Sequence, residues 1–299
     1  MYRGPMKRAL LAGVLAAACD GSSSDTIDAP PGGDVDAAAD AAIDAPGSMG
    51  CGSTGATTGM STETITVGGV ARTFIRVVPA TYDPMRTYPL IFAWHGRTGS
   101  AAGARAYFGM TATVGDNAIM VYPQGLTVTA GDPNDTGWIL TAAGRDVALY
   151  DAIQTAVTQT YCVGRTYSMG HSFGGYMSNA LGCFRGGTAP GKLRAIASIA
   201  GGGPGNNCAG DPLSALIIHG MSDSVVPYAQ GTGSRDAWRA DAACATTTQA
   251  ITPSPCVAYD TCTAGLAVRF CGHNEAAGGG HGWPSFSAGA AWQLFQDSP

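Results

Sequence analysis

The stretch Thr166-Tyr-Ser-Met-Gly-His-Ser-Phe-Gly-Gly-Tyr-Met-Ser-Asn179 decides the fold. It starts with β-branched and aromatic residues, passes through Gly170-His-Ser-Phe-Gly174, and has a helical pattern from Phe173 onward. A serine on so sharp a strand-to-helix turn has backbone angles that only very small neighbours tolerate, so sterics require a glycine two residues before it and another two after it. The first N–H groups of the helix point at the same place and favour a developing negative charge. These features make Ser172 a candidate nucleophile.

Apolar runs on both sides of this stretch indicate strands that are buried on both faces. They cover residues 88–94, 118–122, 193–200 and 213–219, and residues 165–169 form the strand that leads into the turn. Helical patterns at 146–161 and 173–184 lie between them, and strands that alternate with helices imply right-handed crossovers and a parallel sheet. The sequence therefore predicts an α/β fold with a mostly parallel central sheet and helices on both faces.

An antiparallel hairpin is expected before the first buried strand. Residues 62–67 and 70–78 alternate between apolar and polar side chains, and Gly68-Gly69 between them suits a two-residue turn. The hairpin would form one edge of the sheet. The whole of residues 51–299 has the size expected for a single α/β domain.

Residues 1–19 resemble a processing segment that is not part of the fold. Lys7-Arg8 gives a positive start, Ala9 to Ala18 is an apolar run too short to span a bilayer, and small residues precede Cys19. Leu15-Ala-Ala-Ala-Cys19 resembles a bacterial lipobox with its large aliphatic residue one place early, so Cys19 is the lipidation candidate, and ordinary signal cleavage nearby is the alternative. Either route predicts a protein that leaves the cytoplasm, secreted or lipid-anchored at a bacterial envelope.

Composition separates a tether from the domain and limits the partners. Residues 20–50 are rich in Asp, Ala, Ser, Pro and Gly without a periodic apolar face, which indicates a solvated linker.

The whole chain is 45% hydrophobic and 12% charged, enough apolar material for a sizeable core, and its net charge of -5 offers no basic surface for nucleic acid. We expect a monomer whose contact with a membrane goes only through a lipid on Cys19.

The cysteine count agrees with export. Besides Cys19 the chain has an even set: Cys51, Cys162, Cys183, Cys208, Cys244, Cys256, Cys262 and Cys271. Four disulfides are the simplest interpretation for a chain bound for an oxidising compartment. Eight cysteines allow 105 connectivities; we expect Cys256 to pair with Cys262 and Cys244 with Cys271. A zinc site is the rival interpretation, but the sequence has no Cys-x-x-Cys pair.

A serine nucleophile needs an imidazole that takes its proton and a carboxylate that orients the imidazole. Of the five histidines, His95 is expected to shape the loop after the central strand, His171 fills the variable position of the turn and points away from the hydroxyl, and His219 ends a buried strand. His281 lies on the glycine-rich loop Gly278-Gly-Gly-His-Gly-Trp-Pro284 before the last helix, where it can reach across the top of the sheet, and it is preferred to His273.

The carboxylate is expected four residues past a buried strand. Ile217-Ile-His-Gly-Met-Ser-Asp223 places Asp223 there, whereas Asp211 and Asp236 are expected to face solvent. In an open α/β sheet such groups meet at the carboxyl ends of the strands. The chain order Ser172, Asp223, His281 is that of α/β-hydrolases and differs from the orders of chymotrypsin-like and subtilisin-like enzymes.

Several short motifs follow one another along residues 51–299. They are Arg145-Asp-Val147, Tyr161-Cys-Val163, Arg165-Thr-Tyr167, Gly170-His-Ser-Phe-Gly-Gly-Tyr-Met177, His219-Gly-x-x-Asp223-x-x-Val-Pro-Tyr228 and Gly280-His-Gly-Trp-Pro284. Together they resemble the secreted polyhydroxybutyrate depolymerase and feruloyl esterase group, carbohydrate esterase family 1, within the α/β-hydrolase superfamily. The chain departs from the pattern of this group at Trp94 and Arg97.

The resemblance implies an exported serine esterase without a cofactor, with Ser172 as nucleophile, Asp223 as acid and His281 as base. Feruloyl or acetyl esters of plant polysaccharide are the expected substrates, and hydroxybutyrate polyester is the alternative. A catalytically silent hydrolase-fold lipoprotein that only binds is the alternative of another class.

The fold also implies an oxyanion hole made of backbone N–H groups. One donor is the residue after the nucleophile, Phe173. The other should come from the loop after the central strand, His95-Gly96-Arg97, where a glycine lets the backbone approach closely; we assign it to Arg97, with Gly96 as the alternative. His95, Gly96 and Trp283 are the expected pocket residues.

Overall fold

The structure of the protein, a computed structural model, describes residues 47–204, 208 and 210–298. The expected leader, Cys19 and nearly all of the expected tether lie outside these residues. The strands are β1 (Gly59–Val67), β2 (Val70–Val78), β3 (Tyr88–Trp94), β4 (Ile119–Pro123), β5 (Leu126–Thr127), β6 (Thr136–Gly137), β7 (Val163–His171), β8 (Leu193–Ile199), β9 (Ser214–Gly220), β10 (Thr248–Ala250), β11 (Cys256–Tyr259) and β12 (Val268–His273). The helices are α1 (Ala101–Phe108), α2 (Met110–Val114), α3 (Arg145–Thr160), α4 (Phe173–Arg185), α5 (Tyr228–Asp241) and α6 (Ser287–Asp297), with short 3-10 turns η1 (Gly115–Asn117) and η2 (Ala277–Gly280).

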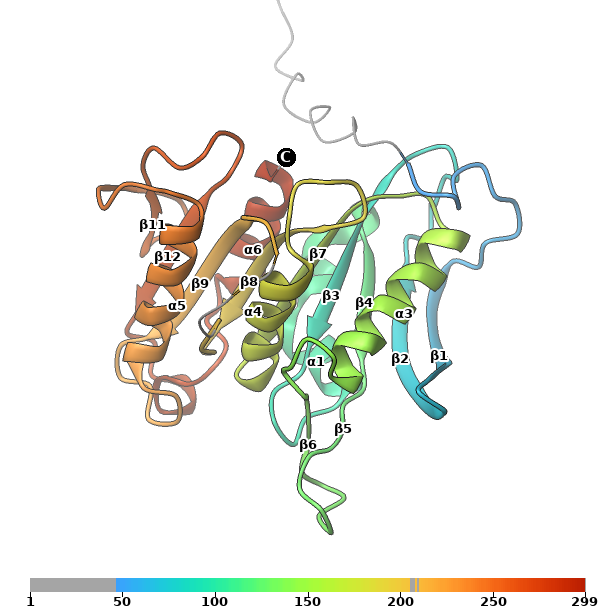
Figure 1. Cartoon of the computed structure of the whole chain (residues 1–299), viewed down its shortest axis with the longest axis horizontal. Helices are drawn as coiled ribbons and strands as arrows, with labels where there is room; N and C mark the ends of the chain where they lie inside the picture. The colour runs from blue at the N-terminus through green and yellow to red at the C-terminus, as the bar shows by residue number, and fades with distance from the viewer. Residues whose placement is uncertain (1–46, 205–207, 209, 299) are drawn as a thin grey trace, which may run out of the picture. The chain divides into compact units, whose positions relative to one another are not determined.

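A ten-stranded sheet runs through the domain in the order β1-β2-β4-β3-β7-β8-β9-β12-β11-β10 (Figure 1). The strands from β4 to β12 in this order are parallel, so their carboxyl ends share one edge. Antiparallel pairs flank them on both sides, β1 and β2 at one end and β11 and β10 at the other. A separate two-stranded hairpin, β5 with β6, follows β4 beyond that shared edge (Figure 1).

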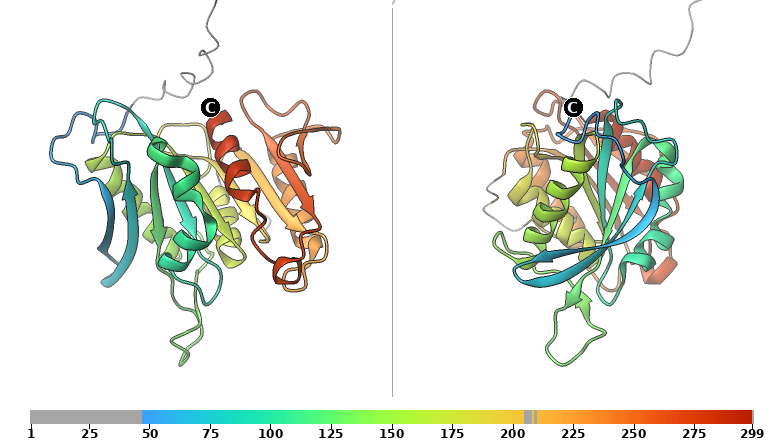
Figure 2. Two further views of the ribbon diagram at one scale, coloured as in Figure 1. Left: turned by 180° about the vertical axis from the view of Figure 1, so that it is seen from behind. Right: turned by 90° about the vertical axis from the view of Figure 1, so that its right-hand side faces the viewer.

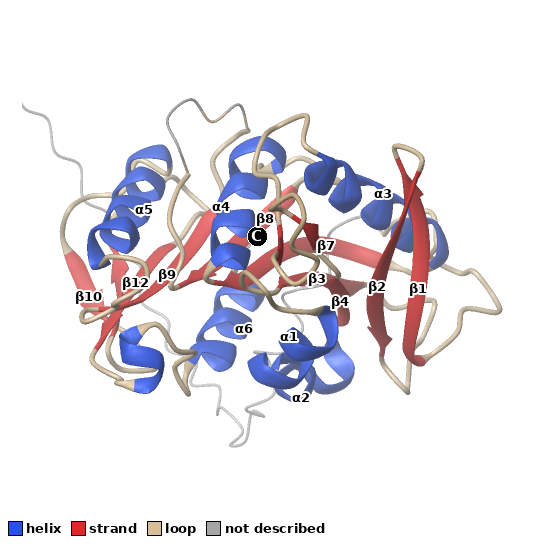
Figure 3. Ribbon diagram, turned by 90° about the horizontal axis from the view of Figure 1, so that it is seen from below, coloured by secondary structure: helices blue, strands red, loops and turns tan. Residues whose placement is uncertain are grey.

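Helices cover both faces of the sheet. α3, α4 and α5 lie on one face, and α1, α2 and α6 lie on the other (Figure 2, Figure 3). Alternate residues of β3 serve the two layers: Phe92 packs in the cluster under α3 and α4, whereas Ile91 packs in the cluster under α1 and α6. Because a central parallel strand is buried on both faces, its sequence is apolar throughout, as Tyr88–Trp94 is.

The predicted fold class is confirmed, and several element bounds are close to the prediction. β2 and β3 begin and end where the alternation and the apolar run place them. The β1–β2 hairpin turns at Gly68 and Gly69, which both have positive φ, and its register pairs Val67 with Val70. The turn is therefore the two-residue type that only glycine-like residues adopt easily.

The C-terminal flank of the sheet was not predicted from the sequence. β12 inserts beside β9 as a parallel strand, and β11 and β10 continue the sheet with antiparallel pairing. β10 and β11 are three and four residues long, too short for a clear alternation. The sequence likewise did not predict α1, α2, α5 or the β5–β6 hairpin.

Four disulfides join the eight domain cysteines, as expected, but two specific pairings were wrong. The bonds are Cys51–Cys162, Cys183–Cys208, Cys244–Cys262 and Cys256–Cys271. Cys256 and Cys271 face each other directly in the antiparallel β11–β12 register, so strand pairing selects this bond over the neighbour in sequence, Cys262. A zinc site built from these cysteines is excluded because their thiolates are consumed.

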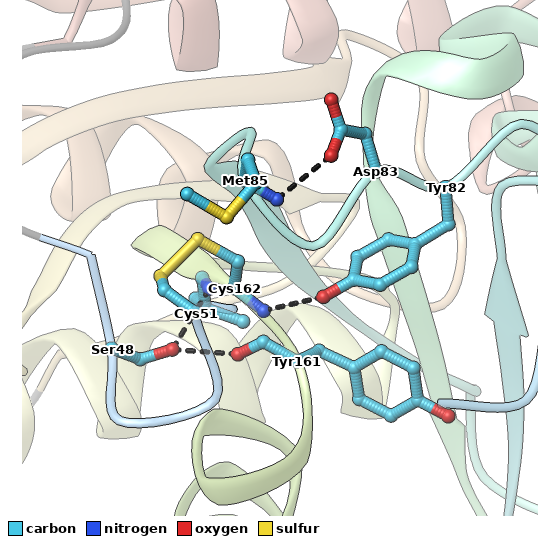
Figure 4. Close-up of a disulfide and its surroundings, with 8 residues drawn as sticks. Ser48, Cys51, Tyr82, Asp83, Met85, Tyr161 and Cys162 are labelled. Carbon is cyan, nitrogen blue, oxygen red and sulfur yellow. Dashed lines mark hydrogen bonds between the residues drawn. A yellow bond between two sulfur atoms is a disulfide. The ribbon is translucent and has the colours of Figure 1, made fainter. Parts of the chain in front are cut away.

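The first disulfide ties the start of the described chain to the centre of the sheet (Figure 4). Cys162 directly precedes β7, and its N–H donates to the hydroxyl of Tyr82 at 2.8 Å. Ser48, which composition assigned to the tether, donates its N–H to Val163 at 3.0 Å and its hydroxyl to the carbonyl of Tyr161 at 2.6 Å. The packed domain thus includes residues before Cys51. Within the described part of the chain, none of the helices has the length and hydrophobicity needed to cross a membrane.

Candidate active site

Ser172 occupies the strained turn between β7 and α4. Its φ is 54° and its ψ is -119°, a conformation that side chains rarely adopt. A Cβ atom on Gly174 would overlap the carbonyl oxygen of Trp94, and one on Gly170 would overlap the backbone of Gly174. The two glycines are therefore required by close backbone packing around the turn. This agrees with the steric argument from the sequence.

The structure brings Ser172, His281 and Asp223 together from three separate segments. The Nε2 atom of His281 lies 2.9 Å from the Ser172 hydroxyl, and its Nδ1 atom lies 2.8 Å from Oδ2 of Asp223. Because a carboxylate only accepts, Nδ1 carries the proton, and Nε2 is left to accept the proton of the serine. This is the arrangement in which an imidazole acts as a general base toward a hydroxyl.

Asp223 is kept ionised by its hydrogen bonds. Its side chain is fully buried, and burial alone would raise its pKa. The hydrogen bond from His281 and those from the N–H groups of Val226 and Val225, at 2.8 and 2.9 Å to Oδ1, more than offset burial and hold the pKa of Asp223 below its ordinary value. The carboxylate of Asp223 is therefore ionised and able to accept the hydrogen bond from His281.

Glycine conformations deliver His281 to the serine. Gly278, Gly279 and Gly280 all have positive φ, so the chain turns sharply immediately before the histidine. A Cβ on Gly220, at the end of β9, would overlap the carbonyl oxygen of Gly280. The loop that carries His281 therefore rests on the end of the strand that precedes Asp223.

The loop His95-Gly96-Arg97 lies against the nucleophile. A Cβ built on Gly96 would lie 3.4 Å from the Cβ of Ser172. His95 is buried, its Nδ1–H donates to the carbonyl of Gly96 at 2.7 Å, and its Nε2 accepts the N–H of Gly125 at 2.9 Å. Its ring therefore shapes the loop instead of lining a pocket. Among the described residues, no hydrogen bond to a backbone acceptor uses the N–H of Arg97 or Phe173.

The two departures from the family pattern have structural explanations. Trp94 is fully buried, donates its indole N–H to Ser168 at 3.0 Å and packs edge to face on Trp138. Arg97 makes two hydrogen bonds of 2.6 and 2.7 Å to Asp135 in the β5–β6 loop and holds the pKa of that carboxyl at about 2. The side chain of Trp94 therefore belongs to the core, and that of Arg97 ties its own loop to the β5–β6 loop.

His171 has a role that the sequence did not reveal. Its Nε2 lies 2.6 Å from the backbone carbonyl of His281, so it donates a hydrogen bond across the site instead of only filling the turn. Burial lowers the pKa of His171 to about 4, with an opposing contribution from this hydrogen bond. The neutral imidazole therefore ties the loop of His281 to the turn that carries Ser172.

Acidification from about pH 6.5 to pH 4 is expected to destabilise the fold, with His171 as one identifiable cause. In this range the unfolded chain binds a proton at position 171 that the folded chain does not, so the free energy of unfolding falls as the pH decreases. Asp223 and Asp135 add acid sensitivity only below their ordinary value of 3.8. Thermal melting across this range should show a smaller pH slope for His171→Gln, which keeps a donor but does not titrate. Equal slopes would contradict the assignment.

An aromatic group borders the base. Trp283 stacks on Phe108 with ring centroids 4.3 Å apart, and its backbone N–H donates to the hydroxyl of Tyr107 at 2.8 Å. Tyr107 is half exposed and lies 5.8 Å from the ring of His171. This group, Tyr107, Phe108 and Trp283, presents a preorganised apolar surface next to the triad.

Two other residues that were considered for the site do not contact Ser172, His281 or Asp223 through hydrogen bonds in the described residues. His273 is buried and its Nδ1 accepts the N–H of Glu275 at 3.2 Å. Asp236 pairs with Arg235 on α5. A cavity of about 640 Å³ opens at the amino ends of β7 and β8, bordered by Arg165, Lys192 and others, whereas Ser172 follows the carboxyl end of β7. In the described residues, no cluster of three or more His, Cys, Asp or Glu could hold a metal ion.

Comparison with known proteins gives feruloyl esterases among the sequence relatives of this chain. Feruloyl esterase D of Neurospora crassa is 30% identical over 255 residues, which cover 78% of this chain and 82% of that protein. Feruloyl esterase C of Emericella nidulans is 35% identical over 170 residues, 54% of this chain and 58% of that protein. The chain therefore matches little more than half the length of feruloyl esterase C. No protein-family model matches the chain.

Solved structures share the fold at low sequence identity. The acetyl xylan esterase from Aspergillus awamori superposes with a TM-score of 0.61 and 15% identity over 80% of this chain and all of that chain. The CE1 ferulic acid esterase from Anaeromyces mucronatus superposes with a TM-score of 0.50 and 16% identity over 81% of this chain and 89% of that chain. These likenesses establish the architecture.

Proposed function

Because this chain belongs to the feruloyl esterase family, we propose that it is an exported serine esterase that cleaves carboxylic esters of plant polysaccharide, feruloyl esters first. The observation that carries the proposal is the continuous relay from the Ser172 hydroxyl through His281 to Asp223, with bonds of 2.9 and 2.8 Å. The family relation supports the reaction class, and the geometry supports the roles of the residues.

The proposed first half of the reaction forms an acyl-enzyme. Oγ of Ser172 attacks the ester carbonyl carbon while Nε2 of His281 takes its proton, and Asp223 stabilises the resulting imidazolium. The carbonyl oxygen becomes negative and is met by the N–H groups of Phe173 and Arg97, which are free of backbone acceptors among the described residues. The C–O bond to the alcohol then breaks, and His281 returns the proton to the departing alkoxide.

The second half returns the enzyme to its starting state. A water molecule enters where the alcohol was, gives its proton to Nε2 of His281 and attacks the acyl carbon. The second tetrahedral intermediate collapses, Oγ of Ser172 recovers a proton, and the carboxylic acid leaves. Every proton passes through His281, so no cofactor is required.

The aromatic group beside the base supports the choice of acyl group. Trp283 follows His281 by two residues, and its stacking on Phe108 and its bond to Tyr107 fix its orientation before substrate binds. A planar aromatic acid gains contact area on such a surface at little entropic cost. An acetyl group would leave the surface unused.

The proposed location is outside the cytoplasm. The four disulfides support it, because such bonds persist in oxidising compartments. Lipid attachment at Cys19 and the monomeric state remain predictions from the sequence.

Initial rates on methyl ferulate, acetylated xylan and polyhydroxybutyrate, measured side by side, test the proposal. Methyl ferulate should give the highest kcat/KM, and Trp283→Ala should raise its KM by about tenfold through lost stacking. Trp292→Ala is the matched control, since Trp292 lies on α6, packs partly buried against the same core cluster as Trp283 and is not part of the aromatic group.

Each other outcome has a definite meaning. Preference for acetylated xylan or for the polyester would reassign the acyl group while keeping the triad. Absence of turnover together with failure of Ser172 to react with a fluorophosphonate would instead favour a hydrolase-fold protein that only binds.

A further inference from the structure

His219 is a second imidazole that lies close to the carboxylate of Asp223. It is fully buried near the end of β9, four residues before Asp223. Its Nε2 is 2.9 Å from the carbonyl oxygen of Val226 and 3.3 Å from Oδ2 of Asp223. Because the carbonyl only accepts, Nε2 carries the proton, and the same N–H faces the oxygen that receives the hydrogen bond from His281.

These bonds close a ring around the acid. The N–H of Val226 donates to Oδ1 of Asp223, and the carbonyl of Val226 accepts from His219. Both oxygens of the carboxylate are thereby engaged: Oδ1 by the backbone of its own turn and Oδ2 by two imidazoles. The direction in which Oδ2 points depends on the turn of residues 223–226, and that turn is bonded to the end of β9 through His219.

The surroundings favour the neutral form of the buried His219 ring. Burial lowers the pKa of His219. The hydrogen bond to the Val226 carbonyl and the charge of Asp223 oppose this lowering, and His281 adds to it. Two other titratable groups face His219. They are His273, whose pKa is lowered in part by the nearby His219, and Tyr228, whose ring lies 6.1 Å away. Its Nδ1 is buried with no hydrogen-bond partner in the described residues, on the side where Gly231 of α5 packs against the ring.

We propose that His219 is a positioning residue for the triad: its Nε2–H holds the turn of Asp223 through Val226 and keeps Oδ2 directed at His281. The inference rests on the proposed function of Ser172, His281 and Asp223. It predicts that a small displacement of the His219 ring slows the activation of Ser172 even though His219 touches no substrate.

A matched pair of glycines on α5 offers the mildest test. A Cβ at Gly231 would overlap Cβ, Cγ and Nδ1 of His219, so Gly231→Ala is expected to displace His219 relative to α5. Gly233, two residues later on the same helix, is exposed and has open space around its Cβ position. Both changes carry the same gain in helix propensity. Gly231→Ala should therefore slow the enzyme by about tenfold, since a displacement of about 1 Å costs up to a hundredfold, and Gly233→Ala should leave the rate unchanged.

Substitutions of the histidine itself complete the test. His219→Leu removes the donor and should slow the enzyme by about 30-fold to 100-fold. His219→Gln places an amide N–H near the position of Nε2 and should restore the rate to within about threefold. His273→Leu is the control, because His273 is also buried, ends the adjacent parallel strand and makes no bond to Asp223.

The measured quantity is the second-order rate of fluorophosphonate labelling of Ser172, with kcat and KM on one ester substrate. The inference predicts losses in labelling rate and kcat at unchanged KM, and loss of the low-field proton resonance of His281 Nδ1–H in His219→Leu but not in His219→Gln. Melting curves identify variants that fail to fold, and Gly231→Ala then decides the question.

Equal labelling rates in the wild type, Gly231→Ala and His219→Leu would overturn the inference while leaving the proposed function intact. Equal slowing by His273→Leu or by Gly233→Ala would also overturn it, because general loosening would then explain the effect. A wild-type protein that the probe does not label would instead contradict the proposed function itself.

Discussion

Ser172→Ala is expected to lower kcat/KM by about four to six powers of ten and to leave the fold intact. The members of a relay act as one unit, so removal of the nucleophile alone forfeits nearly all the catalysis that the relay supplies. Only the hydroxyl is lost, and the glycines that permit the turn, Gly170 and Gly174, remain. Ester hydrolysis and thermal melting of the purified variant measure the two effects.

A second serine provides the control for this experiment. Ser285 is exposed on the loop between His281 and α6 and bonds only to Glu275 within the described residues. Ser285→Ala should retain full activity and full labelling by a fluorophosphonate. Appreciable turnover in a Ser172→Ala preparation free of wild-type enzyme would reassign the nucleophile.

Arg97→Pro is expected to lower kcat by about a hundredfold or more at nearly unchanged KM. The substitution deletes the backbone N–H that the proposal directs at the oxyanion, and loss of one such donor costs about a hundredfold to a thousandfold. The loop lies against Ser172 at Gly96 and is fixed by His95, so the missing donor cannot be replaced by a neighbour without rebuilding the loop.

Arg97→Ala separates the donor from the side chain. Alanine keeps the N–H and loses the ion pair with Asp135, in which the arginine side chain is 60% exposed, and exposed pairs of this kind contribute little to stability. Most of the activity should therefore remain. If Arg97→Pro melts like the wild type and keeps full kcat, the oxyanion assignment to this N–H is wrong.

The parts of the molecule that could be predicted from the sequence are those with local signals. Gly170 and Gly174 predict the turn around Ser172, because the sharp turn tolerates only very small residues at these two positions, and both lie within the same five-residue stretch. The apolar runs predict the strands, because a strand that is buried on both faces has apolar side chains at every position. Asp223 could be placed because it comes just after a buried strand whose carboxyl end lies at the edge where ligands bind, and His281 because it lies on a glycine-rich loop before the last helix.

The parts that could not be predicted depend on the register of distant segments. Cys256 lies six positions from Cys262, yet it bonds to Cys271 because β11 and β12 pair in antiparallel register. β12 itself lies beside β9, far from it in sequence, and nothing in its six residues reveals that neighbour. The bond of His171 to the carbonyl of His281 joins residues 110 positions apart and leaves no trace in either motif.

The disulfide Cys51–Cys162 determines how the domain carries mechanical load. A pull on the N-terminal segment enters the described structure at Gly47 and passes within a few residues through Ser48 and Cys51 to Tyr161, Cys162 and Val163, at the start of β7. The hairpin β1–β2 lies inside the loop that this bond closes, so it is bypassed and is not peeled from the edge of the sheet. Tension applied to the N-terminal segment is thus delivered to a central strand, where parallel neighbours on both sides resist it in shear, and the rim of the sheet stays unloaded.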